Sequence, residues 1–122
     1  MRKMNEVQRF ARWCFGICRI PHCKIVYEPC GLMCDETGDF YGVYIWDDEK
    51  DEPGEIHVAG RMPKRMLMGV LAHEIAHHGQ HITRNLLKTL DADERETKAR
   101  LAASDLLQTW LERGGYTVHW RD

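Results

Sequence analysis

The chain has 122 residues, enough for one domain with a single core, residues 1–122, and few for two. Seventeen Lys and Arg against nineteen Asp and Glu give a net charge of −2, without the cationic excess of nucleic-acid-binding domains. No apolar run approaches the roughly 18 residues that span a bilayer, and the polar N-terminal segment lacks the apolar stretch of a secretory signal. We therefore expect a cytoplasmic protein that binds neither nucleic acid nor membrane, and the sequence leaves its oligomeric state open.

Cysteine and histidine are unevenly distributed along the chain. The five cysteines all lie in the first third, and an odd number without a secretory signal indicates reduced thiols rather than a disulfide framework. Their pairs lack the CxxC spacing of structural zinc sites. Four of the seven histidines fall within one short segment: His73, His77, His78 and His81.

The first half of the chain predicts one helix followed by three strands. Apolar residues recur at three- and four-residue spacings over residues 4–18, which predicts an amphipathic helix that ends before Pro21. Residues 24–28 predict a short strand that leads into a turn-rich connection. Residues 40–46 and 55–59 predict two further strands, joined as a hairpin or meander with an acidic loop at its tip.

The second half predicts two helices and a last strand. From Pro63 the apolar residues recur with the period of a helix, for which Gly79 offers an end. A further helix is predicted over residues 91–113, and Gly114 stops it. The alternation in residues 116–120 predicts a strand.

Residues 73–77 read His-Glu-Ile-Ala-His, the HExxH pattern, inside the first of these two predicted helices. Positions i and i+4 share one face of a helix about 6 Å apart, so His73 and His77 can bind one zinc ion. Glu74 projects beside the ion, where its carboxylate can take a proton from zinc-bound water and return it to a leaving amine. The motif therefore predicts zinc-dependent hydrolysis with Glu74 as the general base.

A catalytic zinc takes three protein ligands and leaves one position for water, so a third ligand is needed. His81 continues the i, i+4 series, but three histidines on a straight helix span about 12 Å and meet only if Gly79 turns the chain. The metzincin pattern HExxHxxGxxH requires Gly and His where this chain has Gln80 and Thr83.

The start of the next predicted helix supplies the other candidates, which are Asp91, Asp93, Glu94 and Glu96. Projection at 100° per residue puts Glu96 near the apolar face of that helix and Glu94 nearly opposite. If Asp91 is the N-cap, Glu94 stands where it can complete a capping box. Glu96 is therefore the predicted third ligand, with Glu94 and His81 as alternatives.

This combination resembles the gluzincin zinc metallopeptidases, and most nearly the ImmA/IrrE-type family, at the size of a one-domain minigluzincin. The resemblance covers residues 54–107: a short strand (GEIHVAG), a helix carrying HEIAHH and an acidic helix (ERETKARLAASDLL). It implies His73, His77 and a later glutamate as zinc ligands, with Glu74 as general base. It also implies that the strand before the HExxH helix is the upper rim of the cleft, where an extended peptide pairs by main-chain hydrogen bonds.

We expect an α+β, zincin-like fold in which a small, mostly antiparallel sheet packs on the HExxH helix, with the third-ligand helix behind it. The expected function is zinc-dependent endopeptidase activity on a peptide or protein. The alternative is a non-catalytic zincin-like module, in which zinc is structural or the cleft binds a protein partner.

Three weaker features have a functional and a plainer interpretation. His78 and His119 could stabilise an oxyanion or be ordinary neighbours. The acidic loop 47–52 could favour basic substrates or be a solvated tip. The tail after Gly115 could block the cleft or pack as a strand on the sheet.

Overall fold

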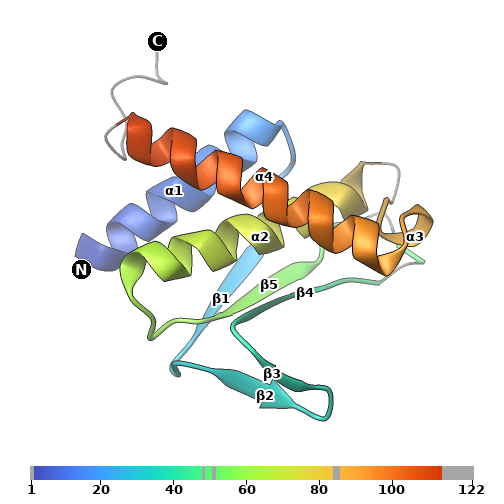
Figure 1. Cartoon of the computed structure of the whole chain (residues 1–122), viewed down its shortest axis with the longest axis horizontal. Helices are drawn as coiled ribbons and strands as arrows, with labels where there is room; N and C mark the ends of the chain where they lie inside the picture. Colours follow the sequence, from blue (N-terminus) through green and yellow to red (C-terminus); the bar gives the residue numbers. More distant parts are fainter. Residues whose placement is uncertain (1, 48, 51, 84–85, 114–122) are drawn as a thin grey trace.

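The computed structural model describes residues 2–47, 49–50, 52–83 and 86–113. The elements in chain order are α1 (Arg2–Cys18), β1 (Lys24–Glu28), β2 (Met33–Asp35), β3 (Gly38–Phe40), β4 (Gly42–Ile45), β5 (Glu55–Ala59), α2 (Lys64–Ile82), α3 (Leu86–Thr89) and α4 (Ala92–Glu112). Figure 1 shows the long helices in one layer above a sheet of β1, β5 and β4, with the β2–β3 hairpin beneath it. The protein is α+β, as predicted.

The three-stranded sheet has the order β1-β5-β4, with β5 in the middle. β4 and β5 pair in antiparallel, as the predicted hairpin requires, but β1 pairs with β5 in parallel. The main sheet is therefore mixed, and the prediction of a mostly antiparallel sheet does not include its parallel pair. The parallel register sets Ile25 opposite Ile56 and Tyr27 opposite Val58, which joins the apolar faces of two strands that are distant in sequence.

A second, two-stranded sheet lies in the segment between β1 and β4. Residues predicted as a turn-rich connection include β2, and Phe40 belongs to β3 instead of the strand that follows. The turn between β2 and β3 is closed by Asp35, whose carboxylate accepts the N–H of Thr37 at 2.7 Å, and by Gly38 at a φ of 126°. Strands of three residues are too short for their alternation to be recognised in a sequence.

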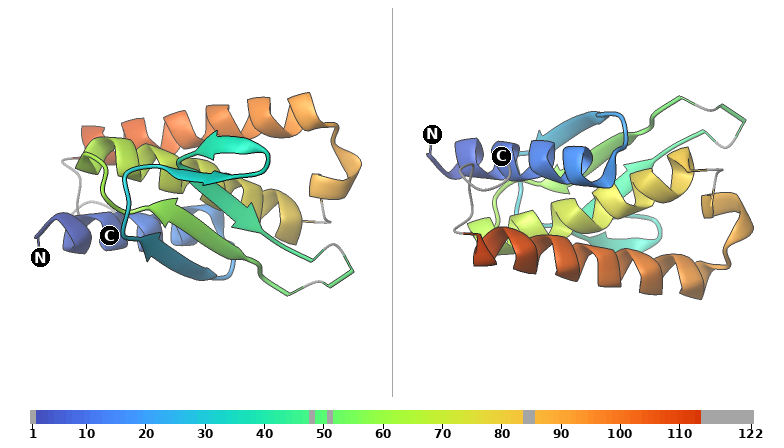
Figure 2. Two further views of the ribbon diagram at one scale, coloured as in Figure 1. Left: turned by 90° about the horizontal axis from the view of Figure 1, so that it is seen from below. Right: turned by 90° about the horizontal axis from the view of Figure 1, so that it is seen from above.

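α2 lies between α1 and α4 and covers one face of the main sheet (Figure 2). The predicted apolar face of α1 is confirmed for Val7, Phe10 and Cys14, which are fully buried, whereas Cys18 is exposed. Phe10 meets Trp110 of α4 with ring centroids 5.5 Å apart, so the first and last helices share one core. All five cysteines are free thiols.

α2 begins directly after Pro63 and continues to Ile82. The prediction that it ends at Gly79 is wrong. A glycine within a helix costs about 1 kcal/mol relative to alanine, and contacts of His78 and His81 with the hydroxyl of Tyr44 offset that cost.

α4 begins at the predicted N-cap, where the carboxylate of Asp91 accepts the N–H of Glu94 at 2.9 Å. Gly114, the predicted strand over residues 116–120 and His119 lie outside the described residues. Within the described ranges, no helix combines the length and the apolar character needed to cross a membrane.

Candidate metal centre

Two histidines of the HExxH motif project from the same face of α2. His73 and His77 are one helical turn apart, and their Nε2 atoms are separated by 3.2 Å. Burial lowers the pKa of His73, and the neighbouring His77 lowers it further, which outweighs the opposing effect of Glu96. A lowered pKa favours the neutral imidazole, which is the form that binds metal ions.

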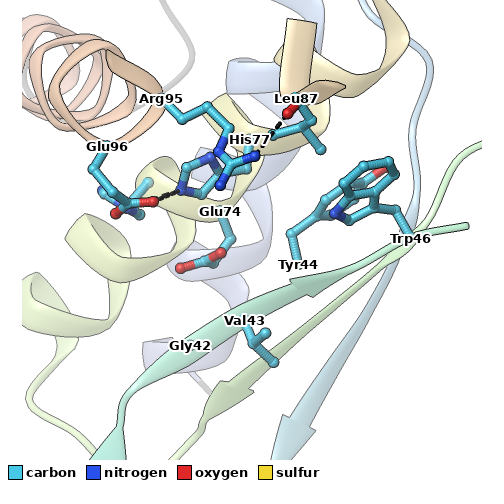
Figure 3. Close-up of a pocket in the computed structure, with 10 residues that line it drawn as sticks. Gly42, Val43, Tyr44, Trp46, Glu74, His77, Leu87, Arg95 and Glu96 are labelled. Carbon is cyan, nitrogen blue, oxygen red and sulfur yellow. Dashed lines mark hydrogen bonds and ion pairs between the residues drawn. The ribbon is translucent and has the colours of Figure 1, made fainter. Parts of the chain in front are cut away.

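Glu96 approaches these two histidines from the first turns of α4. Its carboxylate Oε1 lies 3.1 Å from Nε2 of His73, and Oε2 lies 2.8 Å from Nε2 of His77. The ligand atoms of the three residues all lie within 4.8 Å of one another, so this group could hold a metal ion. Figure 3 shows the Glu96 carboxylate directed at His77 across the gap between α4 and α2.

The separations between these donor atoms fit a small tetrahedral ion. Two ligand atoms bound to one zinc at about 2.0–2.1 Å and at the tetrahedral angle lie about 3.3 Å apart. The observed separations are 3.2 Å between the two Nε2 atoms and 3.1 and 2.8 Å from these atoms to the carboxylate. The spacing of the two histidine nitrogens therefore matches zinc coordination, and Glu96 places one carboxylate oxygen near each of them.

The other acids at the start of α4 do not join this group. Asp91 serves as the N-cap, and the exposed Glu94 donates its own N–H to that cap. The helical projection therefore separates Glu96 from Glu94 correctly, because Ala99 and Ala103 pack inward and turn Glu96 toward α2.

His81 and His78 are buried, and neither belongs to the group of three ligand candidates. Nδ1 of His81 is 2.7 Å from the Tyr44 hydroxyl, and Nε2 donates to the carbonyl of Lys50 at 3.3 Å. Nδ1 of His78 is 3.0 Å from the same hydroxyl, and its Nε2 donates to the carbonyl of Pro21 at 2.7 Å. The alternative of His81 as third ligand is therefore wrong, because α2 does not turn at Gly79.

The sequence also makes His78 a candidate to stabilise an oxyanion. Its side chain is fully buried, so it cannot face a substrate. The hydroxyl of Tyr44, which contacts both buried histidines, also accepts a hydrogen bond from the N–H of Gly54 at 2.8 Å. These contacts fasten the end of α2 to β4 and to the loop that follows it.

Gln80 fixes the orientation of His77. Its side-chain oxygen accepts the Nδ1–H of His77 at 2.9 Å, and its side-chain nitrogen donates to the carbonyl of Arg95 at 3.0 Å. Because Nδ1 carries the proton, the neutral form of His77 has its lone pair on Nε2, where it would bind a metal ion held between His77, His73 and Glu96. Gln80 also ties this histidine to α4, the helix that supplies Glu96.

If the site takes zinc, the metal that the motif predicts, replacing Gln80 with Ala should weaken its binding by about 10- to 100-fold, the usual cost of losing a residue that orients a ligand. Competition with a chromophoric chelator measures this affinity, and a thermal melt checks the fold. The exposed Gln108 on α4 offers a matched control. Unchanged zinc affinity in Gln80→Ala, or an equal loss in Gln108→Ala, would contradict the orienting role.

Glu74 is buried, at 7 % exposure, on the side of α2 that faces β4. Burial, with a contribution from the charge of Glu96, raises the pKa of Glu74 to about 8. A side-chain carbon at Gly42 would lie 2.6 Å from Val70 and 3.2 Å from Glu74, so only glycine lets the strand pass this closely. The structure thus sets a carboxyl group with a raised pKa beside the metal-ligand group.

The metal-ligand group lines a cavity of about 310 Å³ whose other walls are β4 and α3. The strand along this cavity is β4, an edge strand of the main sheet in the described part of the chain. The expectation that the strand before the HExxH helix forms the rim is wrong. That strand is β5, and both of its edges are paired, with β1 and with β4.

Comparisons with protein-family models, with curated proteins and with solved structures found no match.

Four residues around the site are not predicted by the sequence patterns: Gly42, Tyr44, Gln80 and Arg95. Only Gly42 carried a usable signal, because a glycine inside a strand often marks the close approach of another group. Tyr44, Gln80 and Arg95 act through contacts between distant segments, which a local sequence pattern does not predict.

Proposed function

We propose that this protein is a zinc-dependent metalloendopeptidase with a zincin-like fold, similar to the gluzincins and most nearly to the ImmA/IrrE-type metallopeptidases. The observation that carries the proposal is the convergence of His73, His77 and Glu96 within 4.8 Å, next to the buried Glu74. A structural zinc has four protein ligands, whereas this group offers three and borders a cavity, which favours a catalytic site.

The donor set indicates the metal. Two imidazole nitrogens and one carboxylate form the ligand set of zinc peptidases, and imidazole with few oxygens suits zinc better than magnesium or calcium. Zinc in such a site supplies Lewis-acid chemistry, polarising a carbonyl and lowering the pKa of water to about 7. His73, His77 and Glu96 would hold it, and Gln80 would keep His77 in the tautomer that binds.

Glu74 is the residue that we expect to move protons. Burial raises the pKa of Glu74 to about 8 in the metal-free protein, and the positive charge of a bound metal ion would lower it again, which would leave the carboxylate able to accept a proton near neutral pH. Accepting a proton from the attacking water and delivering it to the leaving amine would complete peptide hydrolysis. Its burial against Gly42 limits its rotamers, which keeps the carboxyl group at the cavity wall.

An extended peptide is the substrate that the cavity shape supports best. The edge strand β4 runs along the cavity, and an edge strand offers unpaired main-chain N–H and C=O groups to an added strand. A second hollow, lined by Tyr41, Met66 and Val70, continues past His73 and Glu74 toward the start of β4. The two hollows together would accommodate chain on both sides of a scissile bond, as an endopeptidase requires.

Incubating the zinc-loaded protein with a proteome-derived peptide library tests this function. New peptide termini, detected by mass spectrometry, should appear with zinc and disappear after chelation. A zinc-loaded, folded protein that generates no new termini would contradict the proposal and support the non-catalytic alternative.

A further inference from the structure

We propose that Arg95 binds a carboxylate of the peptide substrate, supplied by an acidic side chain or by the C-terminus. This inference rests on the proposed peptidase function, because it assigns a substrate preference to the same cavity. It concerns the end of the cavity that Trp46 and Leu87 flank.

Arg95 directly precedes Glu96 on α4, and its half-buried side chain lines the cavity. Its Nη1 donates to the carbonyl of Leu87 on α3 at 2.7 Å. Figure 3 shows the side chain reaching from α4 to Leu87, on the side of the site where Tyr44 and Trp46 lie. The guanidinium group is therefore held in place at one end of the cavity.

The charge of Arg95 is not neutralised by an ion pair with any described residue. No described carboxylate lies within 4.0 Å of its guanidinium nitrogens. The charge of Arg95 contributes to the lowered pKa of Asp91, but the carboxylate of Asp91 accepts the N–H of Glu94 as the helix cap. The bond to Leu87 uses one of five N–H donors, so others remain for a bidentate contact with a carboxylate.

The surroundings of the guanidinium group suit a ligand side chain with a carboxylate at its end. Trp46 and the buried Leu87 provide apolar walls for a short aliphatic stem. A half-buried cation pairs more strongly with an incoming anion than an exposed one, because water screens it less. The cavity therefore favours a carboxylate over an amide of the same shape.

The acidic loop after Trp46 suggests the opposite preference, for basic substrates. Its described acids, Asp47, Glu49 and Glu52, are exposed to solvent, and none of them lines the cavity. The charge of Glu52 is also partly balanced by Lys50 at 3.6 Å. Exposed charges are screened over about 8–10 Å at physiological salt, so the contact made inside the cavity decides.

Direct binding measurements separate this inference from the activity. Two series of fluorescein-labelled alanine peptides are compared. In the first, one Glu or one Gln is placed at each position of the peptide in turn. In the second, the peptide ends in either a free or an amidated C-terminus. Fluorescence anisotropy is measured with the zinc-loaded Glu74→Gln protein, which should bind without cleaving. We expect one Glu position, or the free C-terminus, to strengthen binding by about 10- to 100-fold over its neutral counterpart.

Three variants in the Glu74→Gln protein assign that preference. Arg95→Gln should abolish it, and Arg95→Lys should retain part of it because the charge remains. The matched control is Arg100→Gln, which removes the same charge from the same helix at an exposed position. Thermal melts and zinc affinity verify that each variant is folded and loaded.

The outcomes distinguish the two proposals. Equal binding of Glu and Gln peptides by the parent protein, or an equal loss in Arg100→Gln and Arg95→Gln, would overturn the role of Arg95. If Arg95→Gln weakens the binding of acidic and neutral peptides equally, the proposed role is also overturned, because such a loss would indicate that Arg95 contacts the peptide main chain. If the wild-type protein cleaves nothing but the Arg95-dependent preference is observed, the peptidase function fails and carboxylate binding stands.

Discussion

Glu74→Gln should reduce peptide hydrolysis by about 10²- to 10⁴-fold, the usual contribution of a general acid–base residue. Glutamine preserves the shape and the hydrogen-bonding oxygen of the side chain but cannot carry a proton to the leaving amine. Zinc affinity should change by less than about threefold, because Glu74 is outside the group of His73, His77 and Glu96. Rates measured on one peptide from the library, together with chelator competition, check both expectations.

The same substitution should leave the metal-free protein at least as stable as the wild type near neutral pH. The folded-state pKa of Glu74 is raised above its ordinary value of 4.5 to about 8, mainly by burial. A carboxyl group with a raised pKa costs stability as pH rises through that window, and a neutral glutamine removes this cost. Glu94→Gln, at an exposed position, is the matched control for this stability measurement.

For the activity, a rate of peptide hydrolysis in Glu74→Gln equal to that of the wild type would exclude Glu74 as the general base.

Glu96→Ala should weaken zinc binding by more than about 100-fold, because losing a residue that merely orients a ligand already costs about 10- to 100-fold. Glu94→Ala should alter zinc affinity by less than about threefold. The two variants remove the same side chain from the same helix, but only Glu96 reaches the histidines, at 3.1 and 2.8 Å. Chelator competition and a direct count of zinc per chain measure the difference.

Equal zinc affinities in these two variants would contradict the assignment of Glu96. Loss of zinc in Glu94→Ala alone would indicate that α4 is rotated in the zinc-bound protein. Because Glu94 contributes its N–H to the cap through the main chain, its truncation leaves that hydrogen bond in place.

The local parts of the site could be predicted from the sequence. The HExxH pattern and the apolar period around it place His73 and His77 on one face of a helix, and the structure has α2 there. The choice of Glu96 over Glu94 followed from the angular position of each residue relative to Ala99 and Ala103. Both inferences depend only on the helical repeat, which a single sequence displays.

The parts that depend on contacts between distant segments could not be predicted. The parallel pairing of β1 with β5, and so the place of β4 at the edge, depends on which strands meet in the folded chain. His78 and His81 looked like surplus histidines beside the motif, but the hydroxyl of Tyr44, more than thirty residues earlier, holds both in the core. Gln80 showed no pattern at all, since its partners are His77 and the main chain of α4.

The most direct test of the central claim is a crystal structure of the zinc-loaded protein, with anomalous diffraction recorded at the zinc edge. The account predicts one strong peak within bonding distance of Nε2 of His73, Nε2 of His77 and the carboxylate of Glu96, bordering the cavity along β4. A peak at the cysteines or at His81, or no zinc between α2 and α4, would contradict it.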